Sequence, residues 1–579
     1  NHDKFIKMKA SIIKIWILSF SILFISCKDQ SASVYLNQVG YYPTAIKRVF
    51  VSGDFEGETF KIVNDATKNV VFNGVLSSSK EWSHSGTSVC VADFTSIQES
   101  GKYWLQVGNT SRKLIINTNI NKPLGIASLK SYYFARASKP LTEEFVGNYA
   151  RELGHPDNAV IIHSSAASIA RPEGTIISSS GGWYDAGDYN KYVVNSGISI
   201  HTLLQLYELF PDYCDNLQLN IPESNNQIPD ILDEILVNLR WMLTMQDPND
   251  GGVYHKLTSK NFCGMVMPHE DKLERYVVLK TTAAALDFSA VTSKSYRILS
   301  KFENELPGLA DSCLVASKQA WKWAQDNPNI LYVQPKDIST GAYDDNFIED
   351  EKYWAASELY ISTDENDYLN NVNFKTINGT PHWSKVGSLG DFSWIGKNDS
   401  TKTNSDKLKI VKQNLMESAD NLYKTYEESA FKISIDSFAW GSNSDVANQG
   451  VLLIHAFLIS NESKYFEAAE ACLNYILGAN PLDKSFVTGF GINTPINVHD
   501  RRCSADGIEN PIPGLLVGGP TTQARGDCGE ESYKSKLPAL SYVDMECSYS
   551  TNEIAINWNA PLAFLVNAID AINSKRENK

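Results

Sequence analysis

The stretch Ser180–Ser196, SGGWYDAGDYNKYVVNS, places two carboxylates three residues apart, at Asp185 and Asp188. Two carboxyls held close together cannot both ionise freely, so each perturbs the pKa of the other. Glycines, which permit tight turns and the close approach of a ligand, and aromatic rings, which stack on sugar rings, surround the pair; they are Gly181, Gly182, Gly187, Trp183, Tyr184, Tyr189 and Tyr192. The composition alone also fits a solvated turn, so the interpretation depends on the groups that the rest of the chain supplies.

Size and charge limit the classes of protein and partner. The chain has 579 residues, which by length alone suggests roughly two to four domains. Apolar residues make up 43% and charged residues 21%, both ordinary values for a globular protein. The net charge of −15 argues against nucleic acid or an anionic membrane surface as a partner. A neutral polysaccharide is compatible with this charge.

The first residues resemble an export signal. Met8 is the expected start, and the apolar run from Ile15 to Ile25 has the length of a signal sequence rather than of a membrane span. The run closes on Ser26 and Cys27, similar to a bacterial lipidation site; an ordinary secretory signal with an incidental cysteine is the alternative. We expect residues 1–27 to be upstream residues and a lipoprotein signal peptide, and residues 28–32 to be a tether. Cys27 would then carry the lipid anchor and make the only membrane contact. The protein would be exported to the outer membrane or cell surface, on its periplasmic or extracellular face.

The chain has nine cysteines, and eight remain without Cys27. An even number in an exported chain permits disulfides, but the sequence does not show how they pair. Cys503 and Cys528 alone share a loop-rich region at short separation. No Cys-x-x-Cys pair occurs, so a cysteine zinc site is not suggested.

Residues 33–118 are predicted to form a β-sandwich. The runs Lys47–Ser52, Phe60–Val63 and Tyr103–Val107 are rich in β-branched and aromatic residues. Clusters of Gly, Asn, Asp and Ser separate such runs at the spacing of a sandwich. The linker near 117–121 is short, which predicts close docking of the domain that follows.

From Pro123 onward the apolar period is helical. The clearest case is residues 228–246, where Pro229 fits a first turn and apolar residues follow spacings of three and four. Many helices with few strands fit a bundle, a solenoid or an α/α toroid, and the lack of a fixed sequence repeat disfavours the solenoid. Further helices are predicted near 124–137, 192–210, 280–300, 311–326, 351–363, 406–428, 445–459, 462–477 and 552–574.

The order of residues around the two aspartates is more specific. Trp183–Tyr192, WYDAGDYNKY, resembles the DAGD motif of glycoside hydrolase family 9, which includes many β-1,4-glucanases, and Asn37–Pro43 resembles the start of the immunoglobulin-like module that often precedes such catalytic domains. The resemblance implies a mainly α fold, an (α/α)6 barrel over residues 122–577 with an open cleft, preceded by a small all-β immunoglobulin-like sandwich. It also implies that Asp188 is the general base and that Asp185 holds the nucleophilic water and tunes Asp188.

A second acidic signature, Tyr542–Pro561, matches the same family. Glu553 stands at the position of the general acid, and Asp544 matches a second acid that orients or supports the site. We expect an apolar helix to begin at Glu553 and, by partial burial, to raise the pKa of its carboxyl, as an acid requires. The alternative is a first-turn glutamate favoured by the helix dipole.

Inverting hydrolysis gives these carboxyls separate tasks. An ionised base activates water on one face of the sugar, and a protonated acid serves the leaving oxygen on the other, with the two carboxyls about 6.5–9.5 Å apart. Different environments must tune their pKa values in opposite directions. We therefore expect Asp188 and Glu553 to line one site.

A third signature, Ser485–Arg501, resembles the histidine motif of the family. His499 and Arg501 are in place, and Asp500 stands where many members have a second histidine. The resemblance implies that His499 and Arg501 hydrogen-bond sugar hydroxyls beside the cleaved bond.

Weaker resemblances suggest further contacts with the substrate. His255 resembles a sugar-contacting histidine, and Trp354 and Trp440 stand where family members stack glucose rings. Tyr549, within the second signature, and Trp558, five residues after the acid, are also expected at the cleft. For each tryptophan the alternative is a position in the core.

Metal sites are not expected. Some family members bind zinc or calcium, but the sequence has Arg136-Ala137-Ser138 where an Arg-Cys pattern would indicate zinc. In the stretch Tyr276–Lys280, where calcium ligands would be expected, Lys280 supplies no oxygen. No cofactor is required, and a structural calcium stays open because its ligands are not evident.

These patterns together predict an inverting, endo-acting β-1,4-glucan hydrolase and a monomer, with no nucleic-acid partner. The expected substrates are cellulose, mixed-linkage glucan or xyloglucan. One alternative is an exo-acting member of the family, a cellobiosidase or an exo-glucosaminidase, in which loops block one end of the cleft. The other is a non-catalytic surface lipoprotein that binds glycan, which the presence of both Asp188 and Glu553 disfavours.

Overall fold

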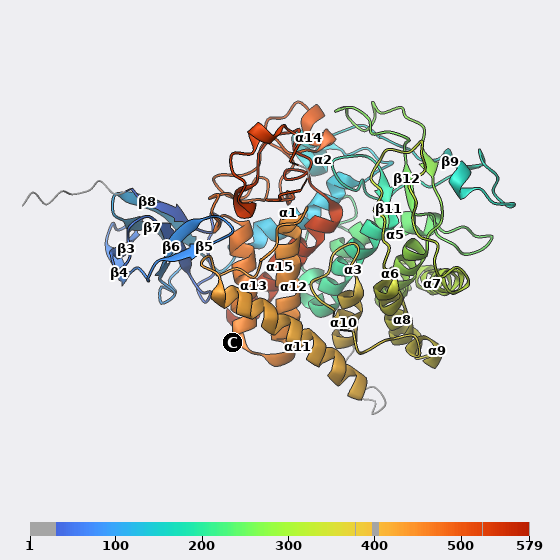
Figure 1. Ribbon diagram of the computed structural model, residues 1–579. Helices are drawn as coiled ribbons and strands as arrows, with labels where there is room; N and C mark the ends of the chain where they lie inside the picture. Colours follow the sequence, from blue (N-terminus) through green and yellow to red (C-terminus); the bar gives the residue numbers. More distant parts are fainter. Residues whose placement is uncertain (1–30, 377, 397–404, 524, 578–579) are drawn as a thin grey trace, which may run out of the picture.

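The structure is a computed structural model that describes residues 31–376, 378–396, 405–523 and 525–577 (Figure 1). The predicted signal peptide, the Cys27 anchor and most of the tether lie outside these residues. Within them, no helix is both long and apolar enough to cross a membrane.

The N-terminal region is a β-sandwich of two antiparallel sheets, at the left of Figure 1. The predicted strands form, and alternate residues of β3 and β7 face the core between the sheets. One sheet has the order β1 (Ser33–Tyr35), β2 (Arg48–Ser52), β6 (Thr87–Asp93), β5 (Lys80–Trp82). The other has the order β4 (Val70–Val75), β3 (Thr59–Asn64), β7 (Gly101–Val107), β8 (Thr110–Ile116).

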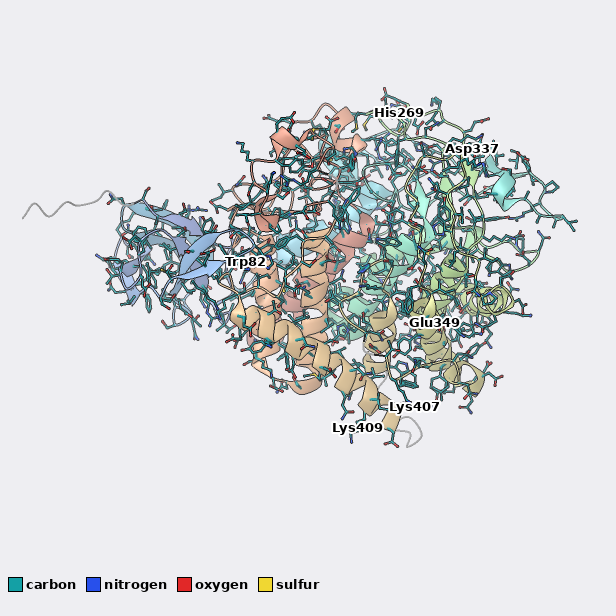
Figure 2. The ribbon with its side chains drawn as sticks, in the orientation of Figure 1. Trp82, His269, Asp337, Glu349, Lys407 and Lys409 are labelled. Carbon is teal, nitrogen blue, oxygen red and sulfur yellow. A yellow bond between two sulfur atoms is a disulfide. The ribbon has the colours of Figure 1, made fainter. Side chains whose placement is uncertain are left out.

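The sandwich docks on the helical region through an apolar contact and a polar one. Trp82, labelled in Figure 2 where the two regions meet, packs against Phe431 and Phe438 at ring-centroid distances of 5.2 and 6.0 Å. Nearby, Arg112 forms an ion pair with Asp483 at 2.7 Å. The apolar contact joins part of the sandwich to the main core of the helical region.

The helical region is built from an inner and an outer layer, and the predicted mainly α fold with a preceding sandwich is confirmed. Inner helices are buried nearly all round, as in α3 and α12, whereas outer helices such as α5 have one apolar face. The inner helices are α3 (Val193–Leu209), α6 (Thr282–Leu299), α8 (Glu349–Thr363), α10 (Gly387–Gly396), α12 (Ser442–Ser460) and α15 (Ile556–Glu577). The outer helices are α1 (Lys122–Ala135), α5 (Asp230–Thr244), α7 (Leu309–Asp326), α9 (Asn366–Leu369), α11 (Ser405–Glu428) and α13 (Ser463–Ile476).

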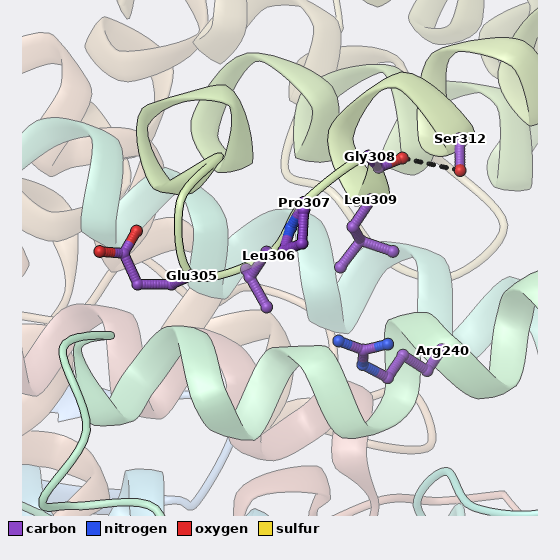
Figure 3. A pocket seen from close by; sticks show the side chains of 7 residues that line it. All are labelled: Arg240, Glu305, Leu306, Pro307, Gly308, Leu309 and Ser312. Carbon is purple, nitrogen blue, oxygen red and sulfur yellow. Dashed lines mark hydrogen bonds between the residues drawn. The ribbon is translucent and has the colours of Figure 1, made fainter.

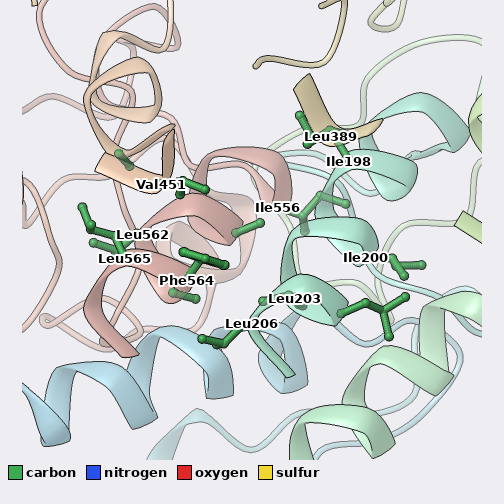
Figure 4. Close-up of a cluster of buried hydrophobic side chains, with 14 of the residues drawn as sticks. Ile198, Ile200, Leu203, Leu206, Leu389, Val451, Ile556, Leu562, Phe564 and Leu565 are labelled. Carbon is green, nitrogen blue, oxygen red and sulfur yellow. The ribbon is translucent and has the colours of Figure 1, made fainter. Parts of the chain in front are cut away.

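Side chains from the inner helices interlock at the centre of this region. Leu203 and Leu206 of α3 belong to the same buried cluster as Leu562 and Phe564 of α15 (Figure 4), and all four are essentially inaccessible to water. Inner helices pack in the sequences α3–α6–α8–α10 and α3–α15–α12. This (α/α)6 arrangement leaves the connecting loops at the ends of the barrel to build a site.

Two features of this region differ from the sequence prediction. α10 was not predicted, because its glycines at 387, 390 and 396 give no helical signal. The last helix begins at Ile556 rather than near residue 552, so Glu553 precedes it and is not a first-turn residue. The short helices α2 (Glu143–Val146), α4 (Pro211–Asp215) and α14 (Arg501–Ala505) lie in connections.

A small five-stranded sheet among the connecting loops was also not predicted. Its strands have two or three residues, too few for a periodic signal. The order is β10 (Ile176–Ile177), β9 (Val160–Ile162), β13 (Tyr276–Val277), β12 (Lys256–Thr258), β11 (Lys191–Tyr192). Because β11 directly follows the two aspartates, this sheet helps to fix them.

One disulfide joins Cys528 to Cys547. The sequence left the pairing open, and Cys503, which shares a loop-rich region with Cys528, is a free thiol. The disulfide ties the loop before the second acidic signature to the signature itself.

Candidate active site

Three of the four carboxyls singled out in the sequence, Asp185, Asp188 and Glu553, line one cleft, with a volume of about 880 Å³. Asp185 and Asp188 come from the loop before β11, and Glu553 comes from the segment before α15. The packing of α3 against α15 brings these two distant parts of the chain together.

Gly187 makes this meeting possible. A Cβ atom at this position would lie 2.2 Å from the carbonyl oxygen of His499, so only glycine fits. The backbone N–H of Gly187 donates to Glu553 Oε1 at 3.3 Å, and its carbonyl accepts from Arg501 Nη1 at 2.7 Å. The loop of the aspartates is thereby fixed to both C-terminal signatures.

Asp188 is buried and held from one side. Its Oδ2 accepts hydrogen bonds from the Asn190 side chain and from the Tyr192 hydroxyl, the latter at 3.3 Å. Hydrogen bonds that are donated to a carboxylate favour its charged form. These two donors orient the Asp188 carboxylate.

Asp185 has no exposed surface. Its oxygens accept from Asn195 Nδ2 and from the Tyr343 hydroxyl, each at 2.9 Å. Burial, and then the charge of Asp188, raise the pKa of Asp185 to about 8. Asp185 is therefore the member of the pair that retains a proton near neutral pH.

Glu553 is held by backbone pairing on both sides of its strand-like segment. It bridges His499, and its carbonyl accepts from Gly518 N at 2.9 Å. Burial, followed by the charges of Asp188 and Asp185, raises the pKa of Glu553 well above its ordinary value. A carboxyl that keeps its proton is what a general acid requires.

His499 and Arg501 also line the cleft. His499 Nδ1 lies 2.6 Å from the carbonyl oxygen of Glu546 and must donate to it, which leaves Nε2 as the acceptor of the neutral ring. Burial lowers the pKa of His499, so the ring stays neutral. Arg501 donates hydrogen bonds to the backbone carbonyls of Cys263 and Gly187, and so stabilises the walls of the cleft.

Aromatic rings cover much of the cleft wall. Trp440 and Tyr549 are 42% and 39% exposed, with ring centroids 5.6 Å apart, and offer a platform for sugar rings. Trp558 also lines the cleft, as predicted. The sequence analysis missed three other lining rings, and no periodic or motif signal marks them: Phe262, Tyr343 and Trp383.

Two predicted substrate contacts are wrong. His255 has no exposed surface; its ring stacks on Tyr332 at 4.1 Å, and its nitrogens bond Thr281 Oγ1 and the carbonyl of Ala342. Trp354 is buried in the core on α8, with its ring centroid 5.2 Å from that of His201 in an edge-to-face arrangement. Neither residue lines the cleft, since both side chains point into the packed interior.

Asp544, the fourth carboxyl of the signatures, does not line the cleft. Its carboxylate accepts from the backbone N–H groups of Ile496 and Asn497, pairs with Lys484 at 3.1 Å and accepts from Asn552 Nδ2. Asp544 supports the loop that leads to His499, which agrees with the supporting role also considered for it.

No group of three or more His, Cys, Asp or Glu side chains in the described part of the chain is arranged to hold a metal ion. At the stretch considered for calcium, the ammonium group of Lys280 lies 2.6 Å from Asp247 and 2.8 Å from Asp250. A cationic side chain thus already pairs with both of these carboxylates.

A second, smaller hollow of about 270 Å³ lies beside α5 and the start of α7 (Figure 3). Its polar side chains are Arg240, Glu305 and Ser312, and the rest of its lining is aliphatic or glycine. It has no pair of carboxyls, so it offers no means of glycosidic cleavage.

Comparison with known proteins gives two family matches. The profile of Glycosyl hydrolase family 9 matches residues 124–566, and that of the cellulase N-terminal ig-like domain matches residues 29–112. Together they span almost the whole of the described chain.

Individual relatives are similar over the same length. A xyloglucan-specific endo-β-1,4-glucanase from Bacteroides ovatus is 42% identical, with 93% of this chain and 94% of the relative covered. Endoglucanase D from Acetivibrio thermocellus is 32% identical, with 93% and 84% covered. A solved structure titled Bacteroides ovatus GH9 superimposes with a TM-score of 0.88 at 41% identity, covering 93% of this chain and 99% of that one.

Proposed function

The chain belongs to glycosyl hydrolase family 9 and is an endo-β-1,4-glucanase of that family, and from this premise we propose an inverting mechanism in which Asp188 is the base and Glu553 the acid. The observation that carries the proposal is that both carboxyls line one cleft while their surroundings differ. Two side-chain donors contact Asp188 Oδ2, whereas burial and the charge of Asp188 raise the pKa of Glu553 and keep it protonated.

Each catalytic group has one proton to move. Asp188 accepts a proton from a water molecule as the water oxygen attacks the anomeric carbon. Glu553 donates its proton to the glycosidic oxygen as the bond to the leaving chain breaks. Asp185, which retains its proton, hydrogen-bonds the water and leaves Asp188 as the charged member of the pair. One displacement inverts the anomeric configuration.

Proton NMR of the first-formed product tests this mechanism. We expect the new reducing end in the α configuration. Glu553→Gln and Asp188→Asn should each lower kcat by about three orders of magnitude or more, while circular dichroism and the melting temperature stay near those of wild type. A first product in the β configuration would refute inversion, and near-wild-type turnover in either variant would remove that residue from its role.

We propose xyloglucan as the preferred glucan among the three considered. The support is the 42% identity over 93% of the chain to a relative named for this specificity. Rates on tamarind xyloglucan, carboxymethylcellulose and mixed-linkage glucan test it, with viscosity loss compared with the release of reducing ends. A higher kcat/KM on an unbranched glucan would contradict the proposal.

Bond cleavage in this scheme requires no metal, because two carboxyls supply both proton transfers. We propose accordingly that a chelator leaves kcat unchanged in protein that stays folded. Activity and melting temperature, measured side by side after treatment with EDTA, test this, and a fall in kcat without unfolding would oppose it.

We also propose that the enzyme acts as an exported monomer anchored through Cys27. The support is the apolar run from Ile15 to Ile25 that ends before Cys27 in the sequence. Membrane fractionation of the full chain and of Cys27→Ala tests the anchor, and light scattering tests the monomer. Release of the wild-type chain into the soluble fraction would oppose the anchor.

A further inference from the structure

Lys256 is a buried lysine behind the wall of the cleft. It lies in β12, opposite Tyr192 of β11, and has no exposed surface. Its ammonium group donates to the carbonyl oxygen of Gly341 at 2.5 Å, to Thr340 Oγ1 at 3.1 Å and to Gln334 Oε1 at 3.3 Å. All three of its N–H groups are therefore used inside the protein. A charge buried at this cost calls for an explanation.

The segment that Lys256 holds belongs to the site. Residues 339–344 line the cleft, and Tyr343 within them donates its hydroxyl to Asp185 at 2.9 Å. Tyr343 has a φ of 50°, a left-handed conformation that a tyrosine adopts only under constraint from its surroundings. The bonds from Lys256 to residues 340 and 341 supply part of that constraint.

The same ammonium group is connected to Asp188 by two routes. It lies 5.5 Å from the centroid of the Tyr192 ring, whose hydroxyl donates to Asp188 Oδ2. The second route is a chain of hydrogen bonds from Thr340 to Thr258, at 2.7 Å, from Thr258 to Asn190, at 3.1 Å, and from Asn190 to Asp188. Both routes end on the same carboxylate oxygen.

Titratable and charged groups face Asp188 from several sides. Asp185 lies beside it, and Glu553 and the neutral ring of His499 face it from the cleft. The hydroxyls of Tyr192 and Tyr343 face it from the wall, and Lys256 lies behind that wall. Two further cations lie nearby: Arg501 lines the cleft, and Arg275 donates to Asn190 Oδ1 at 3.4 Å. The attraction of Asp188 opposes the effect of burial, which lowers the pKa of Lys256 to about 7.

We propose that Lys256 is a positioning residue for the hydrolysis proposed above: its ammonium group fixes the wall that carries Tyr343 and keeps the base Asp188 ionised. A lysine with a purely structural role would only fix the wall. The effect on Asp188 has a separate consequence, because the acidic limb of the profile of kcat/KM against pH reports the ionisation of the base.

The test compares Lys256→Met, Lys256→Gln and Lys256→Arg with wild type on a soluble β-glucan. We expect Lys256→Met to lower kcat at least ten-fold and to move the acidic limb upward by about half a pH unit or more. Lys256→Gln keeps a donor without the charge, so it should show the same shift with a smaller loss of kcat. Lys256→Arg keeps the charge and should leave the limb near that of wild type.

Lys294→Met is the matched control, because Lys294 is equally buried on α6 and pairs with Glu208 at 2.7 Å. It should lower the melting temperature without moving the acidic limb. If Lys256→Met does not fold, the pH profile is measured on Lys256→Gln and Thr340→Val instead. Thr340→Val removes one acceptor of the Lys256 ammonium group and the hydrogen bond to Thr258. An unmoved limb in any folded Lys256 variant that lacks the charge overturns the inference. An inactive wild type would instead refute the proposed function, so the two failures are distinct.

Discussion

A Cβ atom on Gly187 would lie 2.2 Å from the carbonyl oxygen of His499. At Gly187 the backbone of the loop that carries both aspartates therefore packs directly against the segment of His499, which pairs with Glu553. Gly187 N also donates to Glu553 Oε1 at 3.3 Å. One glycine thus determines how closely the base and the acid approach each other.

We expect Gly187→Ala to abolish most activity. Because the obstacle is a backbone carbonyl, the loop itself must move, and a displacement of about 1 Å is enough to cost roughly a hundred-fold in rate. The overpacking should also lower the free energy of unfolding by about 1–3 kcal/mol. Measurements of kcat and of urea unfolding check this, with Gly379→Ala as the control, since nothing lies within 4 Å of a Cβ atom there. A Gly187→Ala enzyme with wild-type kcat would mean that the loop is not rigid.

Asp185→Asn should stabilise the protein, and more so at higher pH. An unfolded aspartate releases its proton near pH 4, whereas burial and Asp188 raise the folded pKa of Asp185 to about 8. Between these values the unfolded state binds fewer protons, so the stability of the wild type falls as pH rises, and asparagine escapes that loss. The gain in the free energy of unfolding should grow by about 1–3 kcal/mol from pH 4.5 to pH 8. Denaturant titrations at both values check it, with Asp326→Asn on α7 as the control; equal gains at both pH values would contradict the assignment of the proton.

Trp440→Ala should weaken substrate binding more than it slows the chemical step. Trp440 is 42% exposed beside Tyr549 and does not contact the three carboxyls through any hydrogen bond of the described residues. Loss of one stacking face of about 1 kcal/mol corresponds to a rise in KM of roughly five-fold. Initial rates on glucan oligosaccharides of increasing length check this. Trp104→Ala, on β7 of the sandwich, is the control and should leave KM unchanged.

The fold was predictable where burial is periodic. The amphipathic pattern at 228–246 gave α5, and the β-branched runs gave β2, β3 and β7, because one face of each element must be apolar. α10 and the short strands β9–β13 depend on tertiary contacts. The glycines of α10 give no helical signal, and the strands are too short to contain a period.

Within the site, the sequence motifs identified the carboxyls but did not show whether each side chain faces the cleft or the core. His255 and Trp354 have the residue types of a sugar site, yet both face inward, and the sequence near them does not distinguish the two faces of a strand or of a fully buried helix. Tyr343 was missed for the converse reason: it follows no pattern, and only folding brings it to Asp185.

Gln38→Ala should reduce both stability and turnover, although Gln38 lies in the sandwich. Gln38 Oε1 accepts from the backbone N–H groups of Ile492 and Asn493 at 2.8 and 2.9 Å, and its Nε2 donates to the carbonyl of Asp483 at 2.9 Å. This loop continues to His499 and is fixed further along by Asp544. Losing these bonds should cost about 1–3 kcal/mol in the free energy of unfolding and lower kcat by several-fold as His499 loosens. Gln106→Ala, exposed on β7, is the matched control; if both variants keep wild-type kcat, the sandwich supports the fold without positioning the site.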